Sequence, residues 1–170
     1  MDLFNVLKVL AIAASPISEL RGAIPIAIIQ FHFPWHYALL LAIIGNLLPV
    51  LFLLLFLDPF SRLLSKISIF EKILHWLFER TRRRGKIINR YGWIGLALFV
   101  AIPLPITGAW TGSLIAVLFG LKFKHAFLSI FIGILIAGVI VTCLSLLGWI
   151  GAIIAGIGLS GLAAFGLWKT

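Results

Sequence analysis

The stretch SPISELRGAIP, residues 15–25, decides how the first third of the chain folds. It lies inside an otherwise apolar run from Leu3 to Ile29 and carries Glu19 and Arg21. In an unbroken spanning helix each of these charges would lie near the bilayer centre, at a cost of about 2.5–3.5 kcal/mol. Proline removes a helix donor and forces a break. We therefore predict a re-entrant hairpin that dips into the membrane and returns.

A second stretch, PLPITGAWTG at residues 103–112, interrupts the uncharged apolar run 92–121 in the same way. Its closely spaced prolines, Pro103 and Pro105, prevent a continuous helix. Irregular backbone at membrane depth is tolerated only where protein or a water-filled cavity surrounds it. This stretch is therefore predicted to form a second re-entrant hairpin.

The two broken runs indicate an internal repeat of about 90 residues. Each is followed by a short connector, residues 31–36 and 122–125, and then by an uncharged run long enough to cross a bilayer, Tyr37–Leu57 and Ala126–Leu147. A further apolar run, Ile150–Trp168, is predicted to be a third crossing. The matching residues are Pro16-Ile17-Ser18 and Arg21-Gly22-Ala23-Ile24 in the first run, and Pro105-Ile106-Thr107 and Thr111-Gly112-Ser113-Leu114 in the second.

Composition indicates a membrane protein. Apolar residues make up 62% of the chain and charged residues 11%, whereas a soluble domain has about 45–50% and about 25%. In a soluble protein the net charge of +9 would suggest a nucleic-acid partner. Here nine of the 14 basic residues lie between Arg62 and Arg90, as expected of a cytoplasmic loop. The charge therefore reports orientation, and no nucleic-acid partner is predicted.

Charge also orients the two hairpins. Residues 31–36 contain no Lys or Arg and are placed outside, whereas residues 58–91, Lys122 and Lys124 are placed inside. The first hairpin then opens outward and the second inward, which is the inverted-repeat plan of many secondary transporters. The predicted fold is an all-α integral membrane protein with one membrane domain, residues 1–170. Its parts are repeat 1 (1–57), a basic cytoplasmic segment (58–91), repeat 2 (92–147) and a C-terminal crossing (148–170).

The basic segment 58–91 has apolar residues at helical spacing and is predicted to be an amphipathic helix at the cytoplasmic interface. Its cluster of Arg82, Arg83, Arg84 and Lys86 is predicted to contact anionic lipid headgroups. The alternative is a topology anchor with no specific ligand.

Glu19 and Arg21 are the strongest functional signal, because ionisable residues inside a membrane segment are costly. Either Glu19 exchanges a proton while Arg21 holds an anionic group, or the two pair and fix the hairpin tip. In the second hairpin, the hydroxyls and the indole either meet a substrate or serve helix packing. Asn46 is either part of a kink with an interhelical hydrogen bond or a substrate contact. The predicted substrate and proton site comprises Pro16, Ser18, Glu19, Arg21, Asn46, Pro103, Pro105, Thr107, Trp110, Thr111 and Ser113.

Other kinds of site have little support in the sequence. It contains no nucleophile motif, phosphate-binding loop or paired-carboxylate pattern, so neither an enzyme nor a cofactor is predicted. Cys143 is alone and the four histidines lack metal-ligand spacing, so no disulfide or metal site is predicted. The last crossing has small residues at a four-residue interval, typical of a seam within the bundle or of a homodimer contact. They are Gly148, Ala152, Gly156, Ser160 and Ala164.

The two proline motifs, residues 15–25 and 103–112, resemble those of the small multi-drug export protein family, a prokaryotic membrane family distantly similar to the DedA proteins. The resemblance covers most of the chain. It implies a compact bundle in the inner or plasma membrane, with two re-entrant hairpins facing opposite sides. DedA-like relatives are associated with proton-motive-force-dependent translocation of lipid carriers such as undecaprenyl phosphate. By that resemblance Glu19 would match an acidic residue of the first hairpin, whereas Thr107 and Thr111 stand where DedA proteins have arginines.

From these observations we expect a secondary exporter, proton-coupled, that holds its substrate between the two hairpin tips. One alternative is a DedA-like translocase that flips an anionic lipid past Arg21, which would supply the positive charge missing from the second hairpin. Another is a non-transporting membrane scaffold that recruits partners through the basic helix. An enzyme is the weakest interpretation, because nothing pairs a nucleophile with a base.

Overall fold

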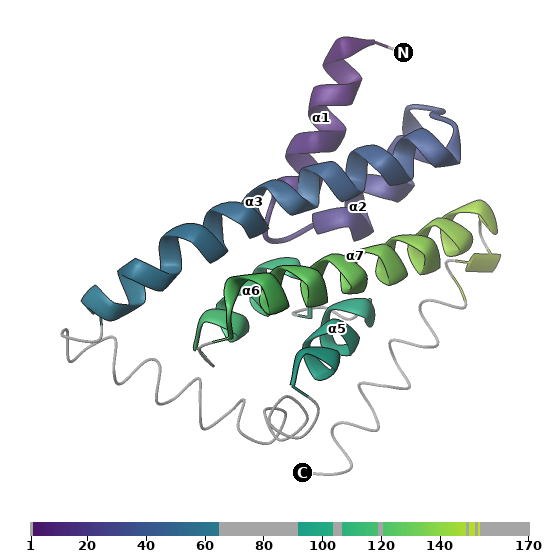
Figure 1. Cartoon of the computed structure of the whole chain (residues 1–170). Helices are drawn as coiled ribbons and strands as arrows, with labels where there is room; N and C mark the ends of the chain where they lie inside the picture. The colour runs from purple at the N-terminus through teal and green to yellow at the C-terminus, as the bar shows by residue number, and fades with distance from the viewer. Residues whose placement is uncertain are drawn as a thin grey trace.

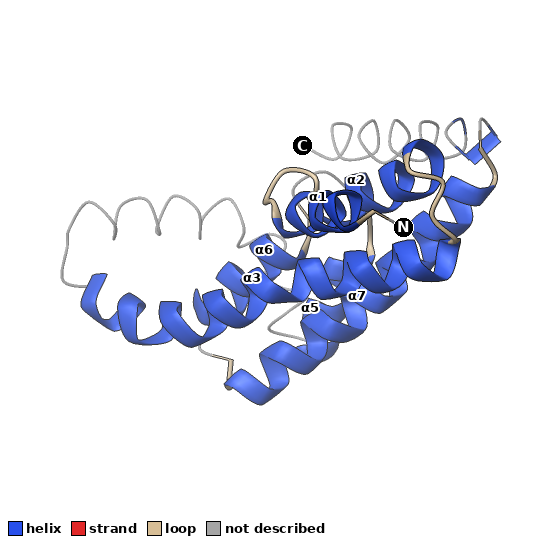
Figure 2. Ribbon diagram, turned by 90° about the horizontal axis from the view of Figure 1, so that it is seen from above, coloured by secondary structure: helices blue, strands red, loops and turns tan. Residues whose placement is uncertain are grey.

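The structure, a computed structural model, describes residues 2–64, 92–103, 107–118, 121–148, 150, 151 and 153. Within these ranges the chain forms six α-helices and one π-helix and has no strand, which confirms the predicted all-helical class (Figures 1 and 2). The elements are α1 (Leu3–Ala14), α2 (Glu19–Pro25), η1 (Ile26–Gln30), α3 (Trp35–Leu64), α5 (Trp93–Ala101), α6 (Ala109–Leu118) and α7 (Phe123–Leu146).

The first apolar run is interrupted where its sequence predicts a break. Helix α1 ends at Ala14, and the Ser15 hydroxyl donates to the carbonyl oxygen of Ile12 at 2.9 Å, satisfying one of the end carbonyls that a helix leaves open. A turn over residues 16–18 leads into α2. Because Pro25 has no N–H, the α-helical pattern changes there to the wider π-helix η1.

The second run is interrupted as well. Helix α5 ends at Ala101, and the Thr107 hydroxyl donates to the carbonyl oxygen of Ile102 at 2.8 Å, which closes the loop between α5 and α6. Helix α6 then begins at Ala109. Both predicted breaks are therefore helix ends, although Pro105 lies outside the described residues.

Two helical segments are long and apolar enough to cross a membrane, Trp35–Phe56 of α3 and Phe123–Leu146. They correspond to the predicted crossings 37–57 and 126–147. Helix α3 continues without a break to Leu64, beyond the predicted boundary at Leu57, because charge marks where a helix leaves lipid and not where it ends. The predicted third crossing and the basic amphipathic helix fall largely outside the described residues.

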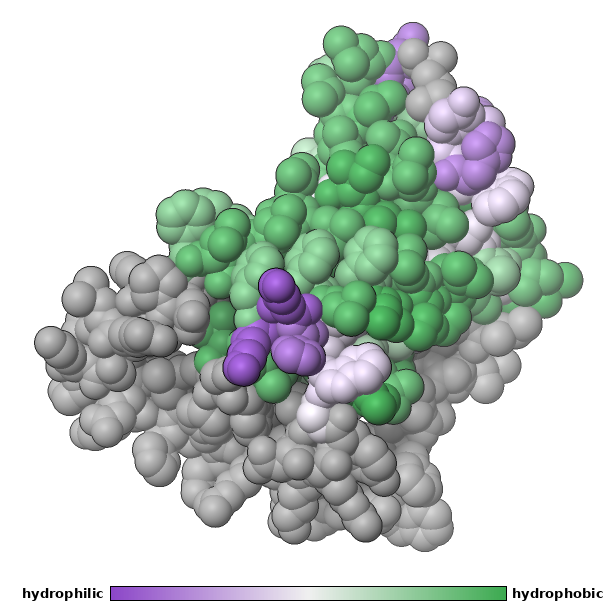
Figure 3. Space-filling view, in the orientation of Figure 1, coloured by the Kyte–Doolittle hydropathy of each residue, from purple (hydrophilic) through white to green (hydrophobic). Residues whose placement is uncertain are grey.

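The surface of the described part is strongly apolar. Figure 3 shows apolar side chains spread across most of the described surface in that view, with hydrophilic residues gathered in small groups. Along α3 the residues Leu40, Ile44, Leu48 and Phe52 are each at least 44% exposed and recur every four residues. A continuous apolar face directed away from the bundle is what lipid contact requires.

The helices pack in two corresponding sets. Helix α1 packs on α3 at Gly45, where an added Cβ would lie 2.7 Å from the Ala13 Cβ, and α5 packs on α7 at Gly133, where it would lie 2.6 Å from the Val100 Cβ. Helix α2 also contacts α7, and α6 contacts α3. In Figure 1, α3 and α7 run in opposite directions.

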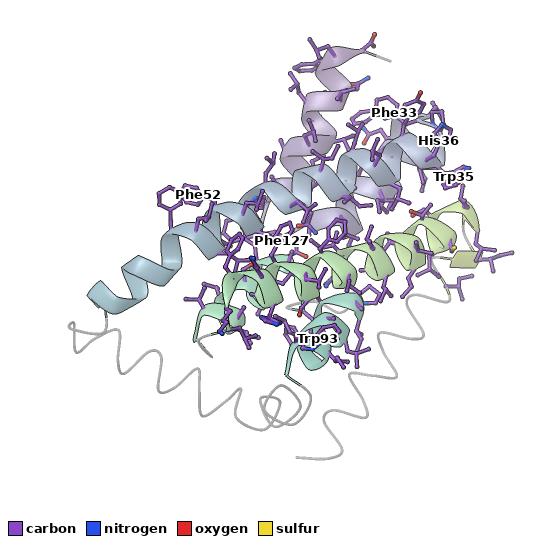
Figure 4. The ribbon with its side chains drawn as sticks, viewed as in Figure 1. Phe33, Trp35, His36, Phe52, Trp93 and Phe127 are labelled. Carbon is purple, nitrogen blue, oxygen red and sulfur yellow. The ribbon has the colours of Figure 1, made fainter. Side chains whose placement is uncertain are left out.

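Aromatic side chains mark the starts of two helices. Phe33, Trp35 and His36 gather at the start of α3, and Trp93 lies at the start of α5 (Figure 4). Trp35 is 51% exposed and Trp93 is 43% exposed. Exposed tryptophans at helix ends are typical of anchors at the membrane interface.

Candidate functional site

Glu19 is the first residue of α2 and is only 7% exposed. Its φ angle is +48°, in the left-handed region that non-glycine residues rarely adopt. Such a conformation costs about 1–3 kcal/mol and persists only where the surroundings hold it. The fold therefore stabilises a strained backbone at the one acidic residue of the first break.

The Glu19 carboxylate reaches the other broken run. Its Oε2 accepts a hydrogen bond from the backbone N–H of Ala109 at 3.4 Å, and its Oε1 accepts one from Trp110 at 3.3 Å. These are the first two residues of α6, whose N–H groups have no partner within the helix. A carboxylate is also favoured there by the partial positive charge of a helix N-terminus. Glu19 thus caps a helix 90 residues away in the chain.

Gly108 makes room for this contact. A Cβ at that position would lie 2.5 Å from the Glu19 Cδ and would also overlap the Glu19 Oε2. No side chain can therefore replace the glycine hydrogen while the carboxylate stays in place. The Glu19 carboxylate that caps α6 therefore explains why residue 108, directly before α6, is a glycine.

The second run caps the first in return. The indole Nε1–H of Trp110 donates to the backbone carbonyl of Ala14 at 3.1 Å. Ala14 is the last residue of α1, where helix carbonyls lack partners within the helix. Each break therefore satisfies an open helix end of the other, and the two breaks are joined by hydrogen bonds in both directions.

Arg21 lies at the same junction. Its Nη2 donates to the Thr107 hydroxyl oxygen at 3.4 Å, and Thr107 is buried with 5% exposure. The Thr107 hydroxyl in turn donates to Ile102, so the guanidinium is joined to the loop between α5 and α6. The structure brings together Glu19, Arg21, Thr107 and Trp110 of the predicted site.

The remaining predicted residues are placed differently. Ser113 is fully buried and its hydroxyl donates to the Ala109 carbonyl at 2.7 Å, which is the packing role. Ser18, Pro103 and Thr111 are half-buried, Pro16 is exposed, and Asn46 is fully buried on α3. Gly148 follows α7 with a φ angle of +57°. Pro105, the basic residues Arg82, Arg83, Arg84 and Lys86, and the small residues Ala152, Gly156, Ser160 and Ala164 lie outside the described residues.

Sequence reasoning missed the hydrogen-bond partners of the Glu19 carboxylate and the Trp110 indole. The Ala109 and Trp110 N–H groups and the Ala14 carbonyl belong to the backbone, so no residue letter identifies them. The offset of 90 residues between the starts of α2 and α6 is the signal that would have paired Glu19 with Ala109.

No metal centre is apparent in the described ranges, where no three His, Cys, Asp or Glu side chains come together.

A family model described as "Putative small multi-drug export protein" matches residues 19–140, more than two thirds of the chain. The match begins at Glu19, directly after the first break, and includes α2, the described part of the second break and most of α7. No curated protein matches the chain. No solved structure matches it either.

Proposed function

Because the chain belongs to the small multi-drug export protein family, we propose that it is a proton-coupled secondary exporter whose substrate is held between two re-entrant hairpin tips. The family description and the apolar helices indicate a membrane protein with a transport role rather than an enzymatic one. Beyond this transport role, we propose that Glu19 is the coupling site, that the proton is the coupling ion and that protonation separates the tips.

The observation that carries the proposal is the buried Glu19 carboxylate on the first N–H groups of α6. When ionised, the carboxylate accepts both hydrogen bonds and is attracted to the helix N-terminus, an effect of about 0.3–1 kcal/mol and up to about 2 kcal/mol when partly buried. A protonated carboxyl loses its charge and one accepting oxygen becomes a donor. Protonation therefore weakens the contact between the tips, so falling pH favours their separation.

An inverted repeat is supported by the correspondence of the two halves. Helices α1 and α5 begin at Leu3 and Trp93, 90 residues apart, and α2 and α6 begin at Glu19 and Ala109 with the same offset. In Figure 1, α1 and α5 enter the bundle from opposite ends. Hairpins entering from opposite faces would meet near the bilayer midplane, where such transporters bind substrate.

The orientation is proposed from charge, with segment 58–91 in the cytoplasm of a prokaryotic cell and the connector 31–36 outside. In a Cys143→Ser background, Pro34→Cys should react with an impermeant thiol reagent added to whole cells. Arg84→Cys should react only after the membrane is opened. Labelling of position 84 in intact cells would contradict the orientation.

The exporter is tested in vesicles that contain the purified chain and carry an imposed pH gradient. Wild type should move ethidium across the membrane in response to the gradient. Glu19→Gln should lose this coupled movement by at least about tenfold, because one charged hydrogen-bonded contact is worth about 1.5–3 kcal/mol. Asp2→Asn is the matched control, since Asp2 is exposed and should have no effect. Undiminished movement in Glu19→Gln would remove Glu19 from the mechanism.

A second candidate, translocation of an anionic lipid, is favoured by the position of Arg21 beside Thr107. A guanidinium can hold a phosphate through two parallel hydrogen bonds. If this candidate is right, purified wild type should carry polyprenyl phosphate, and Arg21→Ala should lose it. Arg21→Lys should retain only part, because lysine lacks the planar pair of donors. Equal lipid content in all three proteins would exclude it.

A further inference from the structure

Asn46 differs from every other buried polar residue in the described part of the chain. Its side chain is fully buried, yet neither Nδ2 nor Oδ1 has a hydrogen-bond partner there. Buried polar groups without partners are rare in native proteins and each needs an explanation. The other buried polar side chains, Glu19, Thr107, Ser113, Ser129 and Thr142, all make hydrogen bonds.

A structural role does not account for Asn46. The interhelical hydrogen bond that the sequence offers as the alternative is not formed with any described residue. Helix α3 also runs without interruption through this region from Trp35 to Leu64. The amide is therefore kept at an energetic cost that helix packing in this state does not offset.

The position of Asn46 connects it to the junction of the hairpin tips. It lies halfway along the 22-residue apolar span Trp35–Phe56. The preceding residue, Gly45, packs against Ala13, next to the Ala14 carbonyl that accepts the Trp110 indole. Helix α3 is also in contact with both α2 and α6. Because Asn46 lies on the helix that both α2 and α6 contact, we expect separation of the tips to expose its amide.

The second repeat has no such amide. Helix α1 packs against Gly45 of α3, and helix α5 packs against Gly133 of α7. The two glycines are 88 residues apart. By that offset Asn46 corresponds to Ile134, which is equally buried. The fold therefore accommodates an apolar side chain at this position, and the amide in the first repeat has another use.

We propose that Asn46 is a substrate-binding residue, resting on the exporter function above, whose amide oxygen accepts a hydrogen bond from an amphipathic amine or amide when the tips part. A ligand with an N–H donor would supply the partner that Oδ1 lacks in the closed state. A ligand of similar size and charge without a donor would gain nothing from Asn46. The residue therefore selects among substrates by their hydrogen-bonding groups.

The test is equilibrium binding of two lipophilic cations to the purified full chain in detergent micelles by calorimetry. Ethidium carries aromatic amino groups, and tetraphenylphosphonium carries no hydrogen-bond donor. Asn46→Leu should raise the dissociation constant for ethidium about tenfold, as expected for one hydrogen bond, and leave that for tetraphenylphosphonium within about twofold. Ile134→Leu, the matched control in the other repeat, should change neither.

Folding and function are separated by two further readouts. The melting temperature of Asn46→Leu should equal or exceed that of wild type, because an unsatisfied buried amide is replaced by an apolar group. Equal ethidium binding by wild type and Asn46→Leu, including no binding by either, would overturn the assignment, as would an equal loss for both cations. Selective ethidium binding without any gradient-driven movement in vesicles would instead overturn the exporter and leave the binding site standing.

Discussion

The two broken runs, which we propose to be re-entrant hairpins, share a backbone plan but differ in chemistry. Their second helices begin at Glu19 and Ala109, 90 residues apart. Two further backbone hydrogen bonds keep this offset, Phe31 N–H to the Ile26 carbonyl at the end of η1 and Leu121 N–H to the Ala116 carbonyl after α6. The first carries a carboxylate and a guanidinium, whereas the second offers mainly backbone N–H groups, hydroxyls and an indole. Two similar backbone frameworks therefore differ in chemistry: one carries the charges, and the other carries the groups that bind them.

This difference in chemistry explains how the two tips can contact each other. Two identical acidic tips would repel each other at the junction. With Ala109 where the first hairpin has Glu19, the second tip presents open N–H groups that a carboxylate can cap. The asymmetry gives one titratable contact between two similar halves, and each prediction below changes one side of it.

The largest effect is expected at Gly108, the residue before α6. In Gly108→Ala the new Cβ would take the place of the Glu19 carboxylate, which then loses both N–H partners. We expect the free energy of unfolding to fall by about 2–4 kcal/mol, with loss of gradient-driven transport. Thermal unfolding in micelles and the vesicle assay measure both.

The control for this change is Ser18, which precedes α2 as Gly108 precedes α6. Ser18 makes no side-chain capping bond to α2, so Ser18→Ala should change the free energy of unfolding by no more than about 0.5 kcal/mol. Equal effects at the two positions would mean that the hairpins are not divided as described.

A smaller effect is expected for the return contact. Trp110→Phe keeps the ring but removes the N–H that bonds Ala14, so the free energy of unfolding should fall by about 1 kcal/mol. Trp93→Phe should have little effect, because Trp93 is 43% exposed. If the two substitutions proved indistinguishable in thermal unfolding, the indole would not join the tips.

The smallest effect is expected at Ser113, which corresponds to Ala23 of the first hairpin by the same 90-residue offset. Its hydroxyl bonds its own helix backbone. Ser113→Ala makes the hairpins alike here and should change stability by less than about 0.5 kcal/mol and leave ethidium transport unchanged. A clear loss of transport with normal stability would place Ser113 in the substrate path.

Much of the framework follows from the sequence because its signals are local. Pro16 and Pro103 mark the breaks, and uncharged runs mark the two long helices. The partners of Glu19 could not be predicted in the same way, since they are backbone groups brought close by packing of segments far apart in the chain. The π-helix after Pro25 and the continuation of α3 to Leu64 also depend on context that residue patterns do not carry.

The central claim is that Glu19 holds the two tips together and releases them on protonation. It is tested most directly by the distance between spin labels on Ile17→Cys and Ile102→Cys, two exposed tip positions, in a Cys143→Ser background. We predict one short distance at high pH, a growing longer population as the pH falls, and the longer population at every pH in Glu19→Gln. A distribution that changes neither with pH nor with Glu19→Gln would contradict the account.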